Sequence, residues 1–138
     1  LPKFLPALQN ADIVIASRRV AGGGEPGRNP VRKIVTVLAC GWIRFWLGVP
    51  VADATSGYRC FRRTLLEKLD WDKMVSVGPS ILEEMLYAAK KTGARIVEIP
   101  FAFQPRAAGK SQLNFRKLLD TLWQVVVFRF RPAPVNKK

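Results

Sequence analysis

The stretch Asp53-Ala-Thr-Ser-Gly-Tyr-Arg-Cys-Phe-Arg62 decides how this chain is interpreted. It places an acid, two small hydroxyl groups, a glycine and two guanidinium groups among aromatic residues. Asp and Gly are disfavoured inside strands, and Thr-Ser-Gly invites a turn where a helix would need to continue. The stretch is therefore predicted to be a loop that presents polar groups.

Three further turns combine basic residues with glycine, and they lie on both sides of this loop. They cover residues 17–24, 28–33 and 106–111. Loops carried on a rigid scaffold are common places for binding residues. Four cationic loops separated by apolar segments therefore predict one anion-binding pocket, and its ligand is expected to be phosphorylated.

The segments between these loops alternate between strand-like and helix-like patterns, which is typical of an α/β fold. A buried strand is predicted over residues 12–16, with Ser17 and Arg18 at its carboxyl end, where ligands gather in open α/β sheets. Asn29 and Pro30 open a helix that Gly48 stops. The other predicted elements are a short helix over 63–69, a helix from the Ser80–Glu83 capping box to Gly93, an edge strand over 95–103 and a helix over 114–129.

Composition limits the possible functions. The chain has 138 residues, enough for one domain, and its 49% hydrophobic content excludes general disorder. A formal charge of +13 predicts a polyanionic partner, which could be nucleic acid, an anionic membrane surface or a phosphate-bearing substrate. The absence of His excludes Ser-His catalysis. Cys40 and Cys60 are interpreted as reduced packing residues. No leader segment is visible, which favours a cytosolic setting.

The order of the motifs resembles the polyprenol-phosphate (dolichol-phosphate) mannosyltransferases of glycosyltransferase family 2. The resemblance runs from about residue 10 to residue 120 and keeps the approximate spacing throughout. The motifs are Asp12-Ile-Val-Ile-Ala-Ser-Arg18, Gly22-Gly-Gly24, Arg32-Lys-Ile-Val-Thr36, the loop from Asp53 to Arg62, Glu84-Met-Leu-Tyr87, Gly93-Ala-Arg-Ile-Val-Glu-Ile-Pro100 and Arg106-Ala-Ala-Gly-Lys-Ser111.

This resemblance implies a GT-A fold and transfer of mannose from GDP-mannose to a polyprenyl (dolichyl) phosphate at the cytosolic face of a membrane. The nucleotide-binding half of that fold, with its metal-binding Asp-x-Asp, is expected to be missing here. Residues 1–130 are thus expected to form a partial GT-A domain, a mixed sheet flanked by helices, and residues 131–138 a frayed basic tail. The Mg²⁺ or Mn²⁺ ligands are expected in the missing half, and Asp70-Trp-Asp72 is interpreted as a solvated turn.

The resemblance also implies roles for single residues. Arg18 and Arg32, with Thr36, would hold the acceptor phosphate, since guanidinium binds phosphate oxygens in pairs. A loop around Arg106 would close over the diphosphate. The predicted catalytic residues are Arg18, Arg32, Asp53 and Glu84; the predicted substrate-binding residues are Ser17, Thr36, Ser56, Arg59, Arg106, Lys110 and Ser111.

Some interpretations stay open at this point. Asp53 could orient sugar hydroxyls, position an arginine such as Arg59, or form a local Asx turn. Glu84 matches a family acid that faces the pocket, whereas capping explains Glu83. Trp42 and Trp46 are interpreted as core or interface anchors.

A non-catalytic basic module is the alternative function, binding either nucleic acid or anionic lipid. Most aromatic residues fall inside apolar helical runs and are not interleaved with Lys and Arg on a sheet, so no nucleic-acid partner is expected. The last predicted helix has an uncharged run only over residues 121–128, too short to cross a membrane. It could lie at a membrane interface or pack on the sheet.

Overall fold

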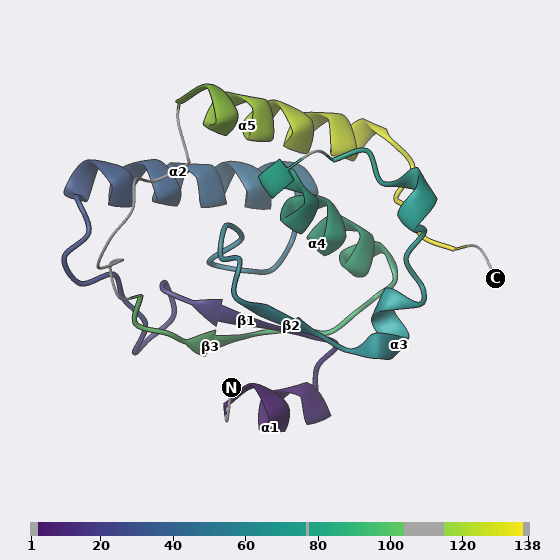
Figure 1. The fold of residues 1–138 in the computed structure, drawn as a ribbon, viewed down its shortest axis with the longest axis horizontal. Helices are drawn as coiled ribbons and strands as arrows, with labels where there is room; N and C mark the ends of the chain where they lie inside the picture. The colour runs from purple at the N-terminus through teal and green to yellow at the C-terminus, as the bar shows by residue number, and fades with distance from the viewer. Residues whose placement is uncertain (1–2, 77, 104–114, 137–138) are drawn as a thin grey trace.

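The computed structural model describes residues 3–76, 78–103 and 115–136, and within them a small mixed sheet is covered by helices on both faces. Helix α1 (Phe4–Gln9) lies on one face, and α4, α2 and α5 lie over the other (Figure 1). The α/β class predicted from the sequence is confirmed. The arrangement is compatible with part of a GT-A fold.

Strand β1 (Ile13–Ser17) is the middle of the sheet, whose order is β2-β1-β3. It pairs antiparallel with β2 (Arg59–Phe61) and parallel with β3 (Ile96–Pro100). Every residue of β1 is buried, because both edges and both faces are covered. This explains the continuous apolar run that predicted the strand, and Pro100 lies on an edge strand as expected.

The loop predicted over residues 53–62 is correct only in its first part, because β2 occupies its end. The backbone N–H of Ala16 donates to the Tyr58 carbonyl at 2.9 Å, and Val14 lies opposite Cys60 in the ladder. Pairing with the buried central strand stabilises an extended backbone here, and no local pattern reveals that partner.

Helix α2 (Pro30–Leu47) has the boundaries that the sequence predicts. The Asn29 side chain accepts a hydrogen bond from the Val31 N–H at 2.8 Å, and Gly48 ends the helix with φ of +62°. One side of the helix, including Cys40 and Ile43, is buried in the core. Both cysteines are free thiols.

The remaining helices are shorter or differently placed than expected. Helix α3 ends at Leu66 (Arg63–Leu66), followed by 3-10 turns at Trp71–Lys73 and Gly78–Ser80. Helix α4 (Ile81–Lys91) begins after Ser80, but the Ser80 side chain makes no capping hydrogen bond, so the predicted capping box is wrong.

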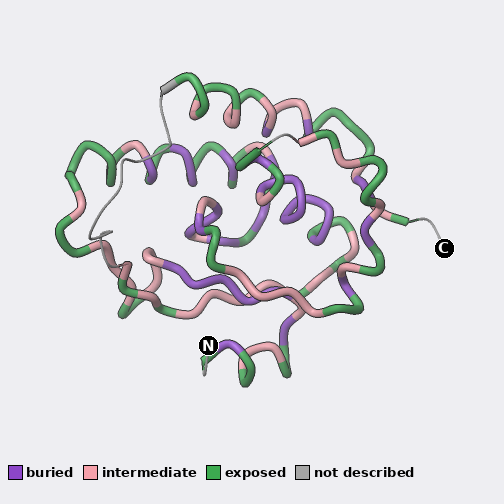
Figure 2. Tube along the Cα trace, viewed as in Figure 1, coloured by how far each residue is buried: buried purple, intermediate pink, exposed green. Residues whose placement is uncertain are grey.

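Helix α5 (Phe115–Phe130) packs along α2 and not directly on the sheet. The indole N–H of Trp42 donates to the Leu122 carbonyl at 3.1 Å across this contact. Burial is concentrated on β1, α4 and the inner side of α2, and the outer sides of α2 and α5 are exposed (Figure 2).

The segment after α5 is not frayed over residues 131–136, which corrects the prediction of a loose basic tail. Val135 forms a bridge with Leu69, and the Asn136 N–H donates to the Lys68 carbonyl at 2.9 Å. Val135 also packs against a small cluster containing Leu69 and Met85. Apolar burial and backbone pairing thus outweigh the basic, proline-rich composition. The last two residues lie outside the described part of the chain.

Candidate functional site

Arg18 is held rigidly at the carboxyl end of β1 by the buried carboxylate of Asp53. Its Nε donates to Asp53 Oδ2 at 2.6 Å, its Nη2 to Oδ1 at 2.7 Å and its backbone N–H to Oδ2 at 3.0 Å. Burial alone would raise the pKa of Asp53, but the hydrogen bonds from Arg18 outweigh it and hold that pKa below its usual value. Asp53 is therefore ionised and fixes the orientation of Arg18.

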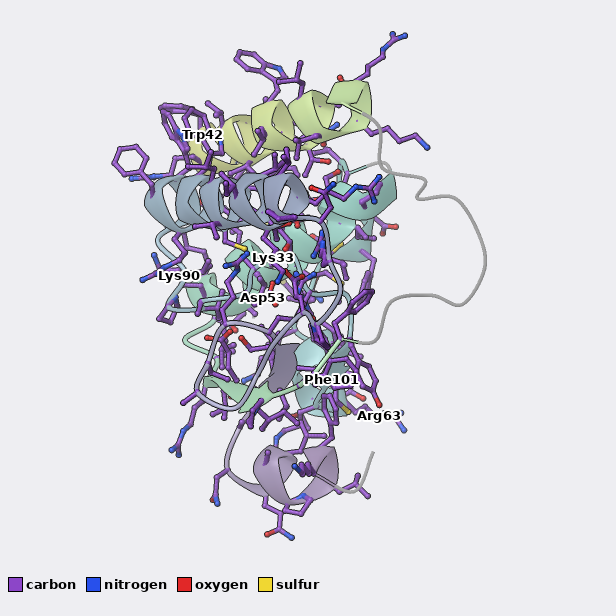
Figure 3. The ribbon with its side chains drawn as sticks, turned by 90° about the vertical axis from the view of Figure 1, so that its left-hand side faces the viewer. Lys33, Trp42, Asp53, Arg63, Lys90 and Phe101 are labelled. Carbon is purple, nitrogen blue, oxygen red and sulfur yellow. The ribbon has the colours of Figure 1, made fainter. Side chains whose placement is uncertain are left out.

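Two groups, one on β3 and one within the loop, hold Asp53 and its loop in place. The Glu98 carboxylate on β3 accepts hydrogen bonds from the backbone N–H groups of Ala52 at 2.7 Å and Asp53 at 2.9 Å. The Thr55 hydroxyl donates to Asp53 Oδ1 at 3.2 Å. In Figure 3, Asp53 lies between α2 and the sheet. Of the alternatives for Asp53, the structure supports positioning of an arginine, but that arginine is Arg18 and not Arg59.

A pocket of about 460 Å³ opens beside Arg18, where β1 and β3 end. Thr55 and Ser56 contribute polar groups to its lining. Aromatic side chains form much of the rest, and the rings of Tyr58 and Phe101 meet edge to face with centroids 5.4 Å apart. The pocket therefore combines one fixed cation with apolar walls.

A chain of charged contacts runs from Arg18 to helix α2. Arg18 Nη1 lies 2.9 Å from Glu25 Oε1, and the same oxygen forms an ion pair with Arg28. Arg28 Nη2 in turn donates to the Thr36 hydroxyl at 3.2 Å. The structure thus connects the two predicted phosphate contacts Arg18 and Thr36 through Glu25 and Arg28, which sequence reasoning did not select.

Comparison with known proteins agrees with the motif order. No family model matches the chain. The chain is 36% identical over 114 residues to an undecaprenyl-phosphate mannosyltransferase of Micrococcus luteus, covering 83% of this chain and 47% of that protein. It is 32% identical over 132 residues to a polyprenol monophosphomannose synthase of Mycolicibacterium smegmatis (95% and 50%) and 30% identical over 125 residues to a dolichol-phosphate mannosyltransferase of Pyrococcus furiosus (88% and 34%).

Over most of its length the chain is thus similar to proteins named as polyprenol-phosphate mannosyltransferases. It spans half or less of the length of these curated relatives. The family resemblance read from the motifs is thereby confirmed.

Arg32 and Thr36, two further predicted phosphate ligands of this mannosyltransferase homologue, do not line the pocket beside Arg18. Arg32 is exposed on the first turns of α2, and no contact of its side chain is seen within residues 3–76, 78–103 and 115–136. Its link to the site is indirect, because the Thr36 hydroxyl donates to the Arg32 carbonyl at 2.8 Å. Arg106, Lys110 and Ser111 lie outside the described residues, so their roles stay predictions.

Three predicted substrate-binding residues of the homologue have structural contacts. The buried Ser17 hydroxyl accepts from the Arg19 N–H at 3.2 Å, and the Ser56 hydroxyl donates to the Ala16 carbonyl at 2.6 Å. Arg59 donates at 2.6 Å to the carbonyls of Ser56 and Leu82, and also to that of Ala54. These contacts shape the loop, and a substrate contact for each residue stays a prediction.

Glu84 lines a different pocket from Arg18, so the expectation that it faces the same cavity is not met. Its carboxylate accepts from the N–H groups of Val75 at 3.1 Å and Ser76 at 2.9 Å, and from the Ser76 hydroxyl. The pocket beside it, about 280 Å³, is also lined by Tyr87 and Arg131. Glu84 therefore holds residues 75–76 in the described structure.

The neighbouring Glu83 does not belong to a capping box, which corrects the sequence interpretation. Its side chain is buried, and within the described residues no hydrogen-bond partner is found for its Oε2. Burial raises the pKa of Glu83 to about 7, and the charge of Arg59 opposes that rise only in part. Burial likewise lowers the pKa of Arg59 to about 10.

Metal binding and membrane crossing have no candidate in the described part of the chain. No group of three or more acidic, Cys or His side chains there could hold a metal ion. Asp70 forms an ion pair with Lys73, in keeping with a solvated turn. Among the described helices, none combines the length and the apolarity that a bilayer span requires.

Proposed function

We propose that the protein carrying this chain transfers mannose from GDP-mannose to the phosphate of a polyprenyl lipid. The observation that carries the proposal is Arg18, which buried Asp53 fixes at the edge of a pocket with aromatic walls. The names of the similar proteins, which join mannose to a polyprenyl phosphate, support it; the GDP-mannose donor is part of the proposal. The non-catalytic alternative is not favoured, because nothing in the described fold sets aromatic rings among cations on an open sheet face as nucleic-acid binding would require.

The proposed reaction is a single displacement. An oxygen of the lipid phosphate forms a bond to the anomeric carbon of mannose, while the bond from that carbon to the diphosphate breaks and GDP leaves. The nucleophile is already an anion and needs no strong general base. The barrier is mainly electrostatic, since two phosphate-bearing substrates approach each other and the leaving group gains charge.

Arg18 supplies what this step requires. Its guanidinium remains protonated at any working pH. Its Nε and Nη2 donate to Asp53 and Thr55, which leaves Nη1 to donate to a phosphate oxygen. Asp53 and Glu98 fix its position before substrate arrives, and the Thr36 hydroxyl adds a neutral polar group nearby. The apolar walls from Tyr58 and Phe101 suit the isoprenoid unit next to the lipid phosphate.

The outer surface formed by α2 and α5 is proposed to rest on the cytosolic face of a membrane. Large apolar side chains are exposed along it, among them Ile34, Leu38 and Phe45 of α2 and Trp123 and Phe130 of α5. In Figure 3, Trp42 lies where these two helices meet. Basic residues such as Arg44 and Arg129 on the same helices would attract anionic headgroups.

A Mg²⁺ or Mn²⁺ ion on the donor diphosphate is also part of the proposal, as the family resemblance implies. The described residues do not offer its ligand set, and its ligands are proposed to lie elsewhere in the protein. The roles of Arg18 and Thr36 do not depend on that ion.

The test is mannose transfer by the full-length protein with Arg18→Ala, Arg18→Lys and Arg32→Ala. Each Ala substitution should lower kcat/KM at least about tenfold, equal to about 1.4 kcal/mol in the barrier. Arg18→Lys keeps a positive charge beside Asp53, but loses the paired hydrogen bonds to Asp53 that fix the orientation of the side chain, so it should also be impaired. Arg63→Ala, whose side chain is 91% exposed on α3, is the control.

Activity of the Arg18 variants within about twofold of the parent would contradict the assignment. Thermal stabilisation of the protein by GDP-mannose with Mg²⁺ separates the transferase from a nucleic-acid binder, which oligonucleotides would stabilise in a steeply salt-dependent way.

A further inference from the structure

One carboxylate oxygen of Glu25 lies between two guanidinium groups. Glu25 Oε1 is 2.9 Å from Arg18 Nη1 and also pairs with Arg28 Nη1. The Glu25 side chain is only 6% exposed, and those of Arg18 and Arg28 are 12% and 23% exposed. An anionic oxygen shared by two arginines is the contact that a phosphate oxygen would also make.

Charge balance indicates which group a phosphate would replace. Arg18 and Arg28 carry two positive charges, and Asp53 and Glu25 carry two negative charges, so the cluster is neutral as it stands. A phosphate dianion gains little from a neutral cluster, and gains more once one carboxylate leaves.

Of the two carboxylates, Glu25 is the one that can leave. Asp53 is completely buried and its carboxylate accepts three hydrogen bonds from Arg18, while the backbone N–H groups of Ala52 and Asp53 donate to the Glu98 carboxylate and hold the loop. Glu25 lies outside any helix or strand, between Gly24 and a turn in which Gly27 has φ of +71°. Within the described residues, the ion pairs of its carboxylate are made with Arg18 and Arg28.

We propose that Arg28 is a further phosphate-binding residue and that the Glu25 carboxylate occupies the phosphate position until the substrate displaces it. This inference rests on the proposed function. Its ligand chemistry is a phosphate group held jointly by Arg18 and Arg28. The Thr36 hydroxyl donates to the Arg32 carbonyl at 2.8 Å and accepts from Arg28 at 3.2 Å, so it positions the Arg28 guanidinium.

The phosphate could come from the lipid acceptor or from the diphosphate of the donor. Thr36 lies in α2, and Arg28 lies just before this helix. The outer side of α2 is apolar and exposed, which favours the lipid phosphate. Binding of a water-soluble short-chain polyprenyl phosphate and binding of GDP, measured separately by calorimetry on the full-length protein, distinguish the two sources.

The first variant is Glu25→Gln, which keeps the shape and an acceptor oxygen but removes the competing charge. The Kd for the short-chain polyprenyl phosphate should fall about tenfold, because the phosphate no longer has to displace a charged carboxylate from Arg18 and Arg28. The Kd for GDP should stay within about twofold. An unchanged or weaker affinity for the lipid phosphate, in a variant with parental circular dichroism, would overturn the proposal.

The second variant is Arg28→Ala, which should raise both the Kd and the KM for the polyprenyl phosphate about tenfold, with the KM for GDP-mannose nearly constant. Glu25→Gln should then increase the affinity for polyprenyl phosphate less in the Arg28→Ala background than in the parent. Such coupling is expected when two residues act on the same ligand. A purely structural role for Glu25 would not produce this coupling. Arg63→Ala serves again as the control.

These results separate the inference from the proposed function. If Glu25→Gln tightens phosphate binding but no mannose is transferred to any lipid, the anion site stands and the activity is wrong. If transfer depends on Arg18 but neither variant changes the lipid-phosphate affinity or KM, the activity stands and Arg28 is not a ligand.

Discussion

At the scale of single residues, the buried Glu83 carboxylate beside the partly buried Arg59 makes the stability of this chain depend on pH. Arg59 and Glu83 are both desolvated, but Arg59 has three backbone carbonyls as partners, whereas Glu83 Oε2 has none within the described residues. The cost of burial therefore falls on the Glu83 carboxylate, whose pKa is raised to about 7.

This pair leads to a prediction for Glu83→Gln. The folded state binds a proton on Glu83 that the unfolded state loses above its ordinary pKa of 4.5, so the stabilisation is fully present below pH 4.5 and is lost by about pH 7. The Gln variant imitates the protonated form. It should match the parent at pH 4.5 and exceed it at pH 8 by an amount on the order of 1.4 kcal/mol or more.

Urea unfolding across that pH range measures the difference. Glu67→Gln is the matched control, because Glu67 is an exposed carboxylate paired with Arg63 on the surface. The difference in unfolding free energy between this variant and the parent should not grow as the pH rises. Parallel pH curves for parent and Glu83→Gln would show that the carboxylate is ionised without cost.

Sequence reasoning at this scale succeeded where the chemistry is local and failed where the partner is distant. Arg18 and Asp53 were selected from their motifs, and the structure joins them. Glu83 was assigned to a capping box because Ser80 stands at the right spacing, yet its neighbour is Arg59 from another part of the chain. Glu98 carried a usable signal, since it is an acid inside the apolar run of β3.

At the scale of elements, the same contrast separates α2 from β2. The ends of α2 were predicted because Asn29, Pro30 and Gly48 set them through their own backbone preferences. The strand β2 was missed because its hydrogen bonds are made with β1, and the residues that form it look like a loop in isolation.

The loop after β1 yields a prediction from two adjacent glycines. A Cβ added at Gly23 would lie 2.4 Å from the Ser17 carbonyl oxygen and 2.9 Å from the Arg18 carbonyl carbon, whereas a Cβ at Gly24 would meet nothing within 4 Å. Gly23→Ala must therefore displace the backbone that carries Arg18. It should lower the affinity for polyprenyl phosphate at least about tenfold, and Gly24→Ala should leave it near the parent value.

Calorimetry and transfer assays compare the phosphate affinity and the activity of the two variants, which add the same methyl group at neighbouring positions. Equal behaviour of Gly23→Ala and Gly24→Ala would mean that the close approach of the loop to β1 has no part in placing the guanidinium.

At the scale of the whole molecule, charge and exposed apolar surface favour the same partner. The chain has a formal charge of +13, and α2 and α5 leave large apolar side chains in solvent. The sequence left a position at a membrane interface open for the last helix, but it did not show that α5 packs on α2 so that their outer sides form one surface. That arrangement depends on packing between distant segments.

The membrane surface gives a prediction for vesicle binding. Phe45 and Trp123 are 78% and 68% exposed, so Phe45→Ser with Trp123→Gln should preserve the fold while removing apolar area from the interface. Partitioning onto vesicles containing anionic lipid should fall at least about tenfold. Trp71→Gln, an exposed tryptophan on a separate 3-10 turn, is the control.

Vesicle co-sedimentation at increasing salt completes this test, because headgroup attraction is screened by ions and apolar insertion is not. Equal binding by the double variant and the parent would place the membrane contact on another face of the protein.

The locking of Arg18 by Asp53 has a consequence for the thermodynamics of binding. A free arginine loses about 2 kcal/mol of rotamer entropy when a ligand immobilises it, but the torsions of Arg18 are already settled during folding. Phosphate binding at Arg18 should therefore have a favourable enthalpy, and the Arg18 side chain should lose little further entropy when the phosphate binds.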